Sequence, residues 1–290
     1  METLFKNANI LTMARNGETA QAMGVRFGRI CKIGDAETVE KYAVADTETR
    51  DLKGMTVIPG FIDVHNHFCL YALLIDQVDC RPAAGCKRGE DVVNALREKA
   101  EKTPPGTWIM GWGYAPYLLE DKMDLTRKDL DRATKDHPIC LVHVSVHGAV
   151  VNSAAIKELG FTRETPDPPG GVILRDTDGV PNGILSESAF MGPLFFNTPS
   201  IYSKIMTAYD REEKAQMMIR CAEAYHRLGI VGAHDPFVDA MTLQTYQDVA
   251  NAGRFPFRMY AYILNSWADP LVAAGIQRGF GSEWVKIGAI

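Results

Sequence analysis

The chain has 290 residues, of which 46% are hydrophobic and 23% are charged, as in globular proteins rather than disordered ones. Its 31 basic and 36 acidic residues leave a net charge of −5, which disfavours nucleic-acid binding as the main function. The N-terminal segment lacks the basic start and apolar run of a secretory signal. The six cysteines include no C-x-x-C pair, so we expect reduced thiols in a cytoplasmic protein and no zinc knuckle.

Short apolar runs separated by turn residues fill the first 57 positions. They lie at residues 4–5, 10–11 and 24–27, with Asn, Gly or Asp around each. Turns about every ten residues predict a small β-sandwich or barrel. Residues 57–62 then form an apolar run that leads into polar positions from Asp63 onward. That is the pattern of a parallel barrel strand whose carboxyl end faces a site.

Residues 70 to about 205 are predicted as a long mixed segment. Its predicted elements are a helix at 90–101, a strand at 107–110, a short helix capped by Thr126 with Asp129, a β-rich stretch at 139–146, a helix from Asn152 to Gly160, and a hairpin of 170–175 with 182–185. The uncharged stretch 137–156 contains three histidines, so we interpret it as a buried strand and a helix start rather than a membrane span.

Strands and helices alternate from Asp210 onward. Asp210 with Glu213 forms a capping-box pattern, and Gly229 predicts the end of the helix that follows. Next come predicted strands at 230–235, 257–263 and 284–290, with helices at 240–252 and 270–278 between them. This alternation indicates parallel strands with right-handed crossovers.

His65 and His67 are two positions apart on the predicted strand, with Asn66 between them. Side chains alternate along a strand, so both imidazoles are expected on one side, where they can share a metal ion. The alternative is two histidines that are satisfied by hydrogen bonds at a strand end. The letters HNH do not indicate a nuclease, because that motif is dispersed and no basic surface supports it.

Residues 59–68, PGFIDVHNHF, closely resemble the first barrel strand of the amidohydrolase superfamily. Further matching motifs follow in the same order, at 108–114, 147–153, 178–187 and 228–235. Together they resemble amidohydrolase family 3, which includes N-substituted formamide deformylases. The resemblance spans nearly the whole chain.

The resemblance implies an α/β fold, a TIM-like (β/α)8 metal-dependent hydrolase barrel flanked by a small β-sandwich. Residues 1–58 would belong to the sandwich, and residues 59–290 would form the first half of the barrel, with the insertion at 70–205. Four barrel strands of eight do not close, so we expect the whole protein to be nearly twice as long. A homodimer is the assembly we consider, and no nucleic acid or membrane partner is expected.

The resemblance also implies that His65 and His67 are ligands of one or two divalent metal ions, for which zinc fits best. Metal-activated hydroxide would then attack a carbonyl or amidine carbon. A bridging carboxylated lysine is expected at the position after Ile290. The remaining histidines and the general-base aspartate would lie beyond it, so we place no catalytic residue in this chain.

Six further residues are candidates for the site. His147, Trp112, Tyr114 and Glu187 are predicted to bind substrate, and Asp63 and Asp235 to support the metal ligands. Four of them have an alternative structural role: His147 held by Asn152 or by backbone, Trp112 packed in the core, a solvated or helix-capping Glu187, and Asp235 as a helix cap or a hydrogen-bond acceptor behind the ligands. His234 is interpreted as structural.

The sequence therefore predicts a metal-dependent hydrolase of non-peptide C–N bonds in small molecules. The alternatives are a deaminase of the same superfamily, acting on a ring amidine, and a non-catalytic relative that keeps the barrel for binding or regulation.

Overall fold

A computed structural model describes every residue of the chain except 197–200, 208 and 290. The chain divides into two compact units, Met1–Ile62 and Asp63–Ile290, and each is described by itself.

The first unit consists of short strands paired in two small sheets. One sheet has the order β5-β4-β1-β6 and the other β3-β2-β7. The strands are β1 (Thr3–Lys6), β2 (Asn9–Leu11), β3 (Thr19–Ala20), β4 (Ala22–Arg26), β5 (Arg29–Gly34), β6 (Glu48–Asp51) and β7 (Thr56–Val57). A helix that the sequence analysis did not anticipate, α1 (Ala36–Glu40), is capped by the Asp35 carboxylate. The unit thus has the short strands that the turn spacing predicts.

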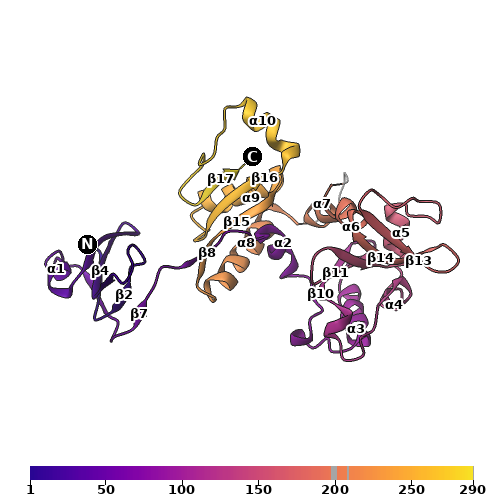
Figure 1. The fold of residues 1–290 in the computed structure, drawn as a ribbon, viewed down its shortest axis with the longest axis horizontal. Coiled ribbons are helices and arrows are strands. Elements are labelled where there is room, and N and C mark those ends of the chain that lie inside the picture. Colours follow the sequence, from indigo (N-terminus) through magenta and orange to yellow (C-terminus); the bar gives the residue numbers. More distant parts are fainter. Residues whose placement is uncertain (197–200, 208, 290) are drawn as a thin grey trace. The chain divides into compact units, whose positions relative to one another are not determined.

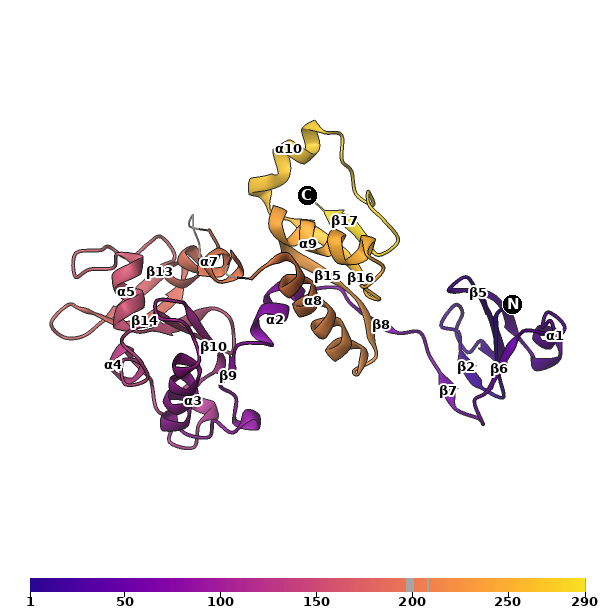
Figure 2. The same ribbon diagram turned by 180° about the vertical axis from the view of Figure 1, so that it is seen from behind.

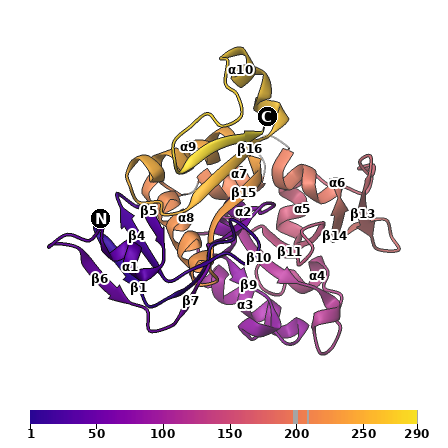
Figure 3. The same cartoon turned by 60° about the vertical axis from the view of Figure 1, so that its left-hand side comes forward.

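The second unit begins with a six-stranded mixed sheet of order β13-β14-β12-β11-β10-β9 (Figure 3). Its strands are β9 (Val78–Asp79), β10 (Ile109–Tyr114), β11 (Ile139–His143), β12 (Gly148–Val151), β13 (Gly171–Arg175) and β14 (Pro181–Glu187). The helices in this part of the chain are α2 (Phe68–Leu74), α3 (Gly89–Glu101), α4 (Arg127–Leu130), α5 (Ser153–Leu159), α6 (Ser188–Met191) and α7 (Ile201–Thr207).

Local capping predictions in this segment are confirmed. Thr126 and Asp129 form a reciprocal capping box at α4. Asn152 accepts a hydrogen bond from the backbone of Ala155 at α5, and Gly160 ends that helix in the left-handed conformation. The predicted hairpin is the antiparallel pair β13–β14. The strand predicted at 107–110 instead starts at Ile109 and extends to Tyr114.

A four-stranded sheet has the order β17-β16-β15-β8, and its strand β8 spans the boundary between the two units at residues 62–63. Its elements are β8 (Phe61–Asp63), α8 (Arg211–His226), β15 (Ile230–Val238), α9 (Ala240–Asn251), β16 (Arg258–Ile263), α10 (Ala268–Ala273) and β17 (Val285–Ala289). β15 pairs with β16, and β16 with β17, in the parallel sense that the alternation predicts. Helix α10 is shorter than predicted because Gly275 takes a φ of 73°, and Ile290 of the last predicted strand lies outside the described residues.

Helices α8 and α9 lie along one face of this sheet (Figures 1 and 2). Alternate residues of β16 and β17 are buried with them, among them Met259, Ala261 and Ile287. Tyr260 and Tyr262 occupy the intervening positions of β16 and are half-buried. The opposite face of the sheet therefore carries polar aromatic side chains rather than a packed helix layer.

Candidate metal and substrate site

The two histidines of the metal motif lie just after β8 and not on it. The strand ends at Asp63, and His67 occupies the N-cap position of α2, so the prediction that both stand on a strand was wrong. Their imidazole rings nevertheless lie side by side, with centroids 5.6 Å apart and planes at 88°. Both side chains are exposed. The turn after the strand brings them together as strand alternation was expected to do.

The spacing of the two rings fits shared coordination of one metal ion. Zinc–nitrogen bonds of about 2.0–2.1 Å in tetrahedral geometry put the centroids of two ligating imidazoles roughly 5 Å apart. The observed 5.6 Å is close to this value. Among the described residues, no group of three or more His, Cys, Asp or Glu side chains is arranged to hold a metal ion. The two imidazoles alone fall short of the three protein ligands that zinc sites use.

A chain of hydrogen bonds fixes the turn that carries the histidines. Asp63 accepts from the backbone N–H of His65 at 3.2 Å and from the side-chain amide of Asn66 at 2.8 Å. The Asn66 oxygen accepts from the Tyr225 hydroxyl at 2.9 Å. Asn66 also donates its backbone N–H to the carbonyl of His234 on β15. Asp63 thus orients the backbone between the histidines, as its position two residues before His65 suggested.

Asp235 is fully buried and holds the N-terminus of α2. Its carboxylate accepts from the backbone N–H of Cys69 at 3.0 Å and from the Tyr246 hydroxyl at 2.6 Å. His67, the N-cap residue, makes no side-chain capping bond. A carboxylate on another strand therefore caps the helix, which leaves the His67 imidazole available. His234, the residue before Asp235, forms a hydrogen bond between its Nδ1 atom and the Tyr262 hydroxyl at 2.8 Å.

Partial burial of the His67 imidazole favours its neutral form. Desolvation lowers the pKa of His67 below its usual value. The charge of Asp235 opposes this shift, and the neighbouring His65 adds to it. Because only a neutral imidazole can ligate a metal ion, the lowered pKa favours the form that binds.

A pocket of about 280 Å³ opens beside His67. Most of its lining side chains are aromatic or aliphatic. The others are two histidines, one asparagine, one arginine and one glycine. It is lined by Asn66, His67, Leu70, Tyr71, Leu74, Arg81, Trp112, Gly113, Val142, His143, Val144, Val146 and Tyr225. Trp112, a predicted substrate-binding residue, thus lies in the same pocket as the candidate ligand His67. Its ring meets that of Tyr71 edge-on at 5.9 Å.

His147, Tyr114 and Ser145 line a second pocket of about 280 Å³. The two pockets share His143, and side chains 142–147 alternate between them, with the valines in the first pocket and the polar residues in the second. The hydroxyl of Tyr114 is already engaged, since it donates to the Met123 carbonyl and accepts from the Leu125 N–H. Burial raises the pKa of Tyr114 to about 12.

His147 and Glu187 are partners. The Nδ1 atom of His147 lies 3.1 Å from a Glu187 carboxylate oxygen. Asn152 is not the partner of His147, because its side chain bonds the backbone of residues that include Ile139 and Ala155. Glu187 has a φ of 48° and Val146 a φ of 60°, values that are rare for residues with a Cβ, and for a β-branched residue a true outlier. The pairing brings together two residues that are 40 positions apart.

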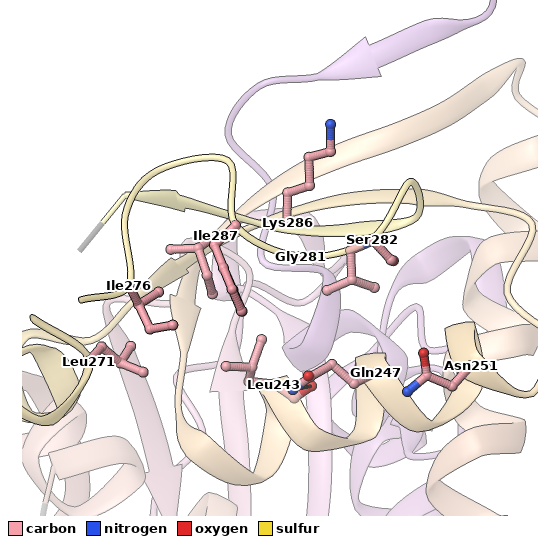
Figure 4. A pocket seen from close by; sticks show the side chains of 11 residues that line it. Leu243, Gln247, Asn251, Leu271, Ile276, Gly281, Ser282, Lys286 and Ile287 are labelled. Carbon is pink, nitrogen blue, oxygen red and sulfur yellow. Dashed lines mark hydrogen bonds between the residues drawn. The ribbon is translucent and has the colours of Figure 1, made fainter. Parts of the chain in front are cut away.

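A further hollow of about 430 Å³ lies between α9 and residues 271–287. Figure 4 shows Leu243, Gln247 and Asn251 along α9 opposite Ile276 and Ile287. Neither histidine of the metal motif lines it, so we do not assign it to the chemistry.

Several site residues escape sequence reasoning. Tyr71, Arg81, His143 and Tyr225 line the pocket beside His67, yet no motif singles them out. Tyr71 and Tyr225 lie on helices at positions whose spacing indicates core packing. Arg81 lies shortly after a strand of only two residues. The strict alternation of valines with polar residues at 142–147 is the one signal that could have indicated His143.

Comparison with known proteins identifies relatives over most of the chain. The family model described as "Amidohydrolase family" matches residues 48–290. The chain is 32% identical over 258 residues to "N-substituted formamide deformylase" of Arthrobacter pascens, covering 87% of this chain and 46% of that protein. It is 27% identical over 275 residues to YtcJ of Bacillus subtilis strain 168, covering 93% of this chain and 50% of that protein.

A solved structure shares the fold. It is that of an uncharacterized metal-dependent hydrolase from Pyrococcus horikoshii OT3, with a TM-score of 0.73 at 22% identity, covering 99% of this chain and 53% of that chain. The chain spans about half the length of the curated relatives it matches. Within the residues that the structure describes, no helix is long and apolar enough to cross a membrane.

Proposed function

The chain belongs to the amidohydrolase family, and from this we propose that the whole protein is a metal-dependent hydrolase of non-peptide C–N bonds in small molecules. The observation that supports this most directly is the pair of His65 and His67 rings, 5.6 Å apart, beside a largely apolar pocket. The similarity to a protein named as a formamide deformylase favours amide hydrolysis over deamination.

The residues of this chain have separate roles in the proposal. His65 and His67 hold a divalent metal, for which zinc suits nitrogen ligands. A bound zinc ion lowers the pKa of a water molecule to about 7, which makes a nucleophile available at neutral pH. Asp63 orients the turn between the histidines, and Asp235 fixes the start of α2. Both therefore act on the positions of the ligands rather than on substrate.

Substrate would occupy the pocket beside His67, with its apolar part against Trp112 and Tyr71. His147 and Glu187 would contact it from the neighbouring pocket. Because the Nδ1 atom of His147 faces the Glu187 carboxylate, its Nε2 atom can accept a hydrogen bond from an N–H group of the substrate. The ring of Tyr114 would contribute a wall only, since its hydroxyl is already bonded. Water exclusion by these apolar walls strengthens each polar contact with substrate.

We further propose that β8, β15, β16 and β17 are four strands of an eight-stranded barrel, with residues 70–205 as an insertion. A carboxylated lysine at the position after Ile290 and a general-base aspartate further on would complete the site. The coverage of about half of each relative supports this reading. The first unit would join a β-sandwich with a later part of the protein.

The test is the metal content of the full-length protein, purified without chelator and measured by elemental analysis. We expect about one or two metal ions per chain, and a His65→Ala/His67→Ala variant that loses the metal and the hydrolysis of amides. His226→Gln, which changes a histidine at the end of α8, is the control and should keep both. Less than about 0.2 metal per chain would contradict the proposal, because such sites bind tightly. Ammonia release from ring amidines but not from amides would identify a deaminase instead.

A further inference from the structure

Arg81 is held rigidly by Asp79 at the rim of the pocket beside His67. Its Nε and Nη2 atoms donate to the two carboxylate oxygens of Asp79 at 2.9 and 2.6 Å, and its backbone N–H donates to the same carboxylate at 3.0 Å. The hydrogen bond to Asp79 raises the pKa of Arg81, so the guanidinium stays charged. One edge of the guanidinium is thereby fixed in a bidentate pair.

Trp112 and Gly113 fix the plane of the same side chain. The guanidinium carbon lies 4.3 Å from the centroid of the Trp112 ring, which is stacking distance for a cation–π contact. A Cβ on Gly113 would lie 2.5 Å from the Cγ atom of Arg81, so only glycine at position 113 leaves room for the Arg81 side chain in this position. Arg81 is therefore ordered before any ligand arrives, and binding to it costs little further side-chain entropy.

The other edge of the guanidinium has no hydrogen-bond partner among the residues that the structure describes. The Nη1 atom of Arg81 makes no hydrogen bond with a described residue, and among the residues that line the pocket there is no carboxylate. The indole N–H of Trp112 is also buried without an acceptor in the described part of the chain. Arg81 thus keeps one donor edge without an acceptor among the described residues, in a pocket whose lining holds no other Lys, Arg, Asp or Glu side chain.

We propose that Arg81 determines specificity by binding a carboxylate of the substrate, and that the preferred substrates are N-acyl derivatives of hydrophobic amino acids. The carboxylate would bond to the free edge of Arg81, while the apolar side chain would lie against Tyr71, Trp112 and the valines of residues 142–146. A carboxylate is the acceptor that a planar, half-occupied guanidinium binds best. This inference rests on the proposed hydrolysis at His65 and His67.

The experiment compares two substrates that differ in one carboxylate, N-formyl-phenylalanine and N-formyl-2-phenylethylamine, with the full-length metal-loaded protein. We expect kcat/KM to favour the first at least about tenfold, mainly through KM. Arg81→Met should bring the ratio to about one, and Arg81→Lys should give an intermediate ratio, because lysine keeps the charge without the planar fork. A wild-type protein that shows no preference, or an Arg81→Met variant that keeps it, would overturn the inference.

Arg220→Met is the matched control. Arg220 pairs with Asp76, and the side chains of that pair are 45% and 30% exposed, against 44% and 29% for Arg81 and Asp79. Its removal should leave the substrate ratio unchanged. If both arginine variants change the ratio equally, loss of an ion pair explains the effect and Arg81 has no special role.

A binding measurement separates this inference from the proposed function. Calorimetric titration of N-formyl-phenylalanine into the full-length His65→Ala/His67→Ala variant requires no turnover. Binding that weakens at least about tenfold with Arg81→Met in that background supports the carboxylate site even if no hydrolysis is found. Hydrolysis of both amides at equal rates, with binding that is indifferent to Arg81, would keep the proposed function and exclude this specificity.

Discussion

At the scale of single residues, the most consequential side chain is the Asp235 carboxylate. It lies on β15 and accepts the backbone N–H of Cys69 on α2, which is 166 positions away in the chain. It also accepts the N–H of Phe237 on its own strand. One buried group therefore couples the sheet to the start of α2, the helix whose N-cap residue is His67.

Replacing Asp235 with asparagine should destabilise the protein by about 2–4 kcal/mol. The change removes a buried charged acceptor at a helix N-terminus and turns an amide N–H₂ toward groups that donate. Urea unfolding of the variant and the wild type measures the loss. Tyr246→Phe, which removes one donor and leaves the helix cap, should cost only about 1 kcal/mol. An Asp235→Asn variant within 0.5 kcal/mol of the wild type would contradict the role assigned to this carboxylate.

Residue roles were predictable from sequence where partners are close along the chain. Asp63 accepts a hydrogen bond from the backbone of His65 two positions later, a local contact that the short spacing makes easy to anticipate. Arg81 and Tyr225 meet the site through the fold, from positions with no motif of their own. For such residues only the packing of α2, α8 and β10 determines proximity, and sequence alone does not encode it in readable form.

At the scale of elements, strand ends were less predictable than strand existence. β8 ends at Asp63, where the Asp63 side chain accepts the backbone N–H of His65 in place of a strand partner. The alternation of hydrophobic residues does not reveal where a side chain competes for a backbone hydrogen bond. Helix starts at Thr126, Asn152 and Asp210 were predictable, because capping is a local interaction.

The hairpin β13–β14 depends on a glycine at position 183. Its φ is 99°, and a Cβ there would lie 2.4 Å from the backbone oxygen of Val151. Gly183→Ala should therefore lower the free energy of unfolding by at least about 2 kcal/mol, because the strained backbone and the clash act together. Gly179→Ala in the same hairpin, whose Cβ would meet only the flexible Arg163 side chain at 3.2 Å, should cost about 1 kcal/mol. Thermal unfolding of both variants measures the difference, and equal losses would contradict the argument.

Helix α8 is joined to the segment after α9 by a pH-sensitive ion pair. Arg254 donates to both carboxylate oxygens of Glu212 at 2.7 and 2.8 Å, and this pair, with Gln216, lowers the pKa of Glu212 from 4.5 to about 2. Because the folded pKa lies below the unfolded one, the stabilisation is complete above about pH 4.5 and is lost as the pH falls toward 2.

The corresponding prediction concerns Glu212→Gln. The urea midpoint of this variant should lie below that of the wild type at pH 5–7, and the two should converge as the pH falls from 4.5 toward 2. Glu223→Gln, a change on the same helix at a residue that forms no ion pair with any described residue, should show no such convergence. A midpoint difference that stays constant down to pH 2 would show that the pair does not titrate as expected.

At the scale of the whole molecule, the decisive property is how many metal ligands the 290 residues contain. The described residues bring two imidazoles together and no third His, Cys, Asp or Glu. Zinc sites use at least three protein ligands. The chain alone should therefore bind zinc with a Kd above about 1 µM, which corresponds to a binding free energy weaker than about 8 kcal/mol. The His65→Ala/His67→Ala variant should lose that binding.

Competition dialysis of residues 1–290 against a zinc indicator measures this affinity, and the same measurement on a longer protein with the proposed further ligands provides the contrast. We expect the longer protein to retain zinc through dialysis at nanomolar free metal, because additional ligands increase the binding free energy while the two histidines are already placed. Nanomolar affinity in the 290-residue chain would mean that its own residues complete the site. Zinc binding that persists without both histidines would show that they are not its ligands.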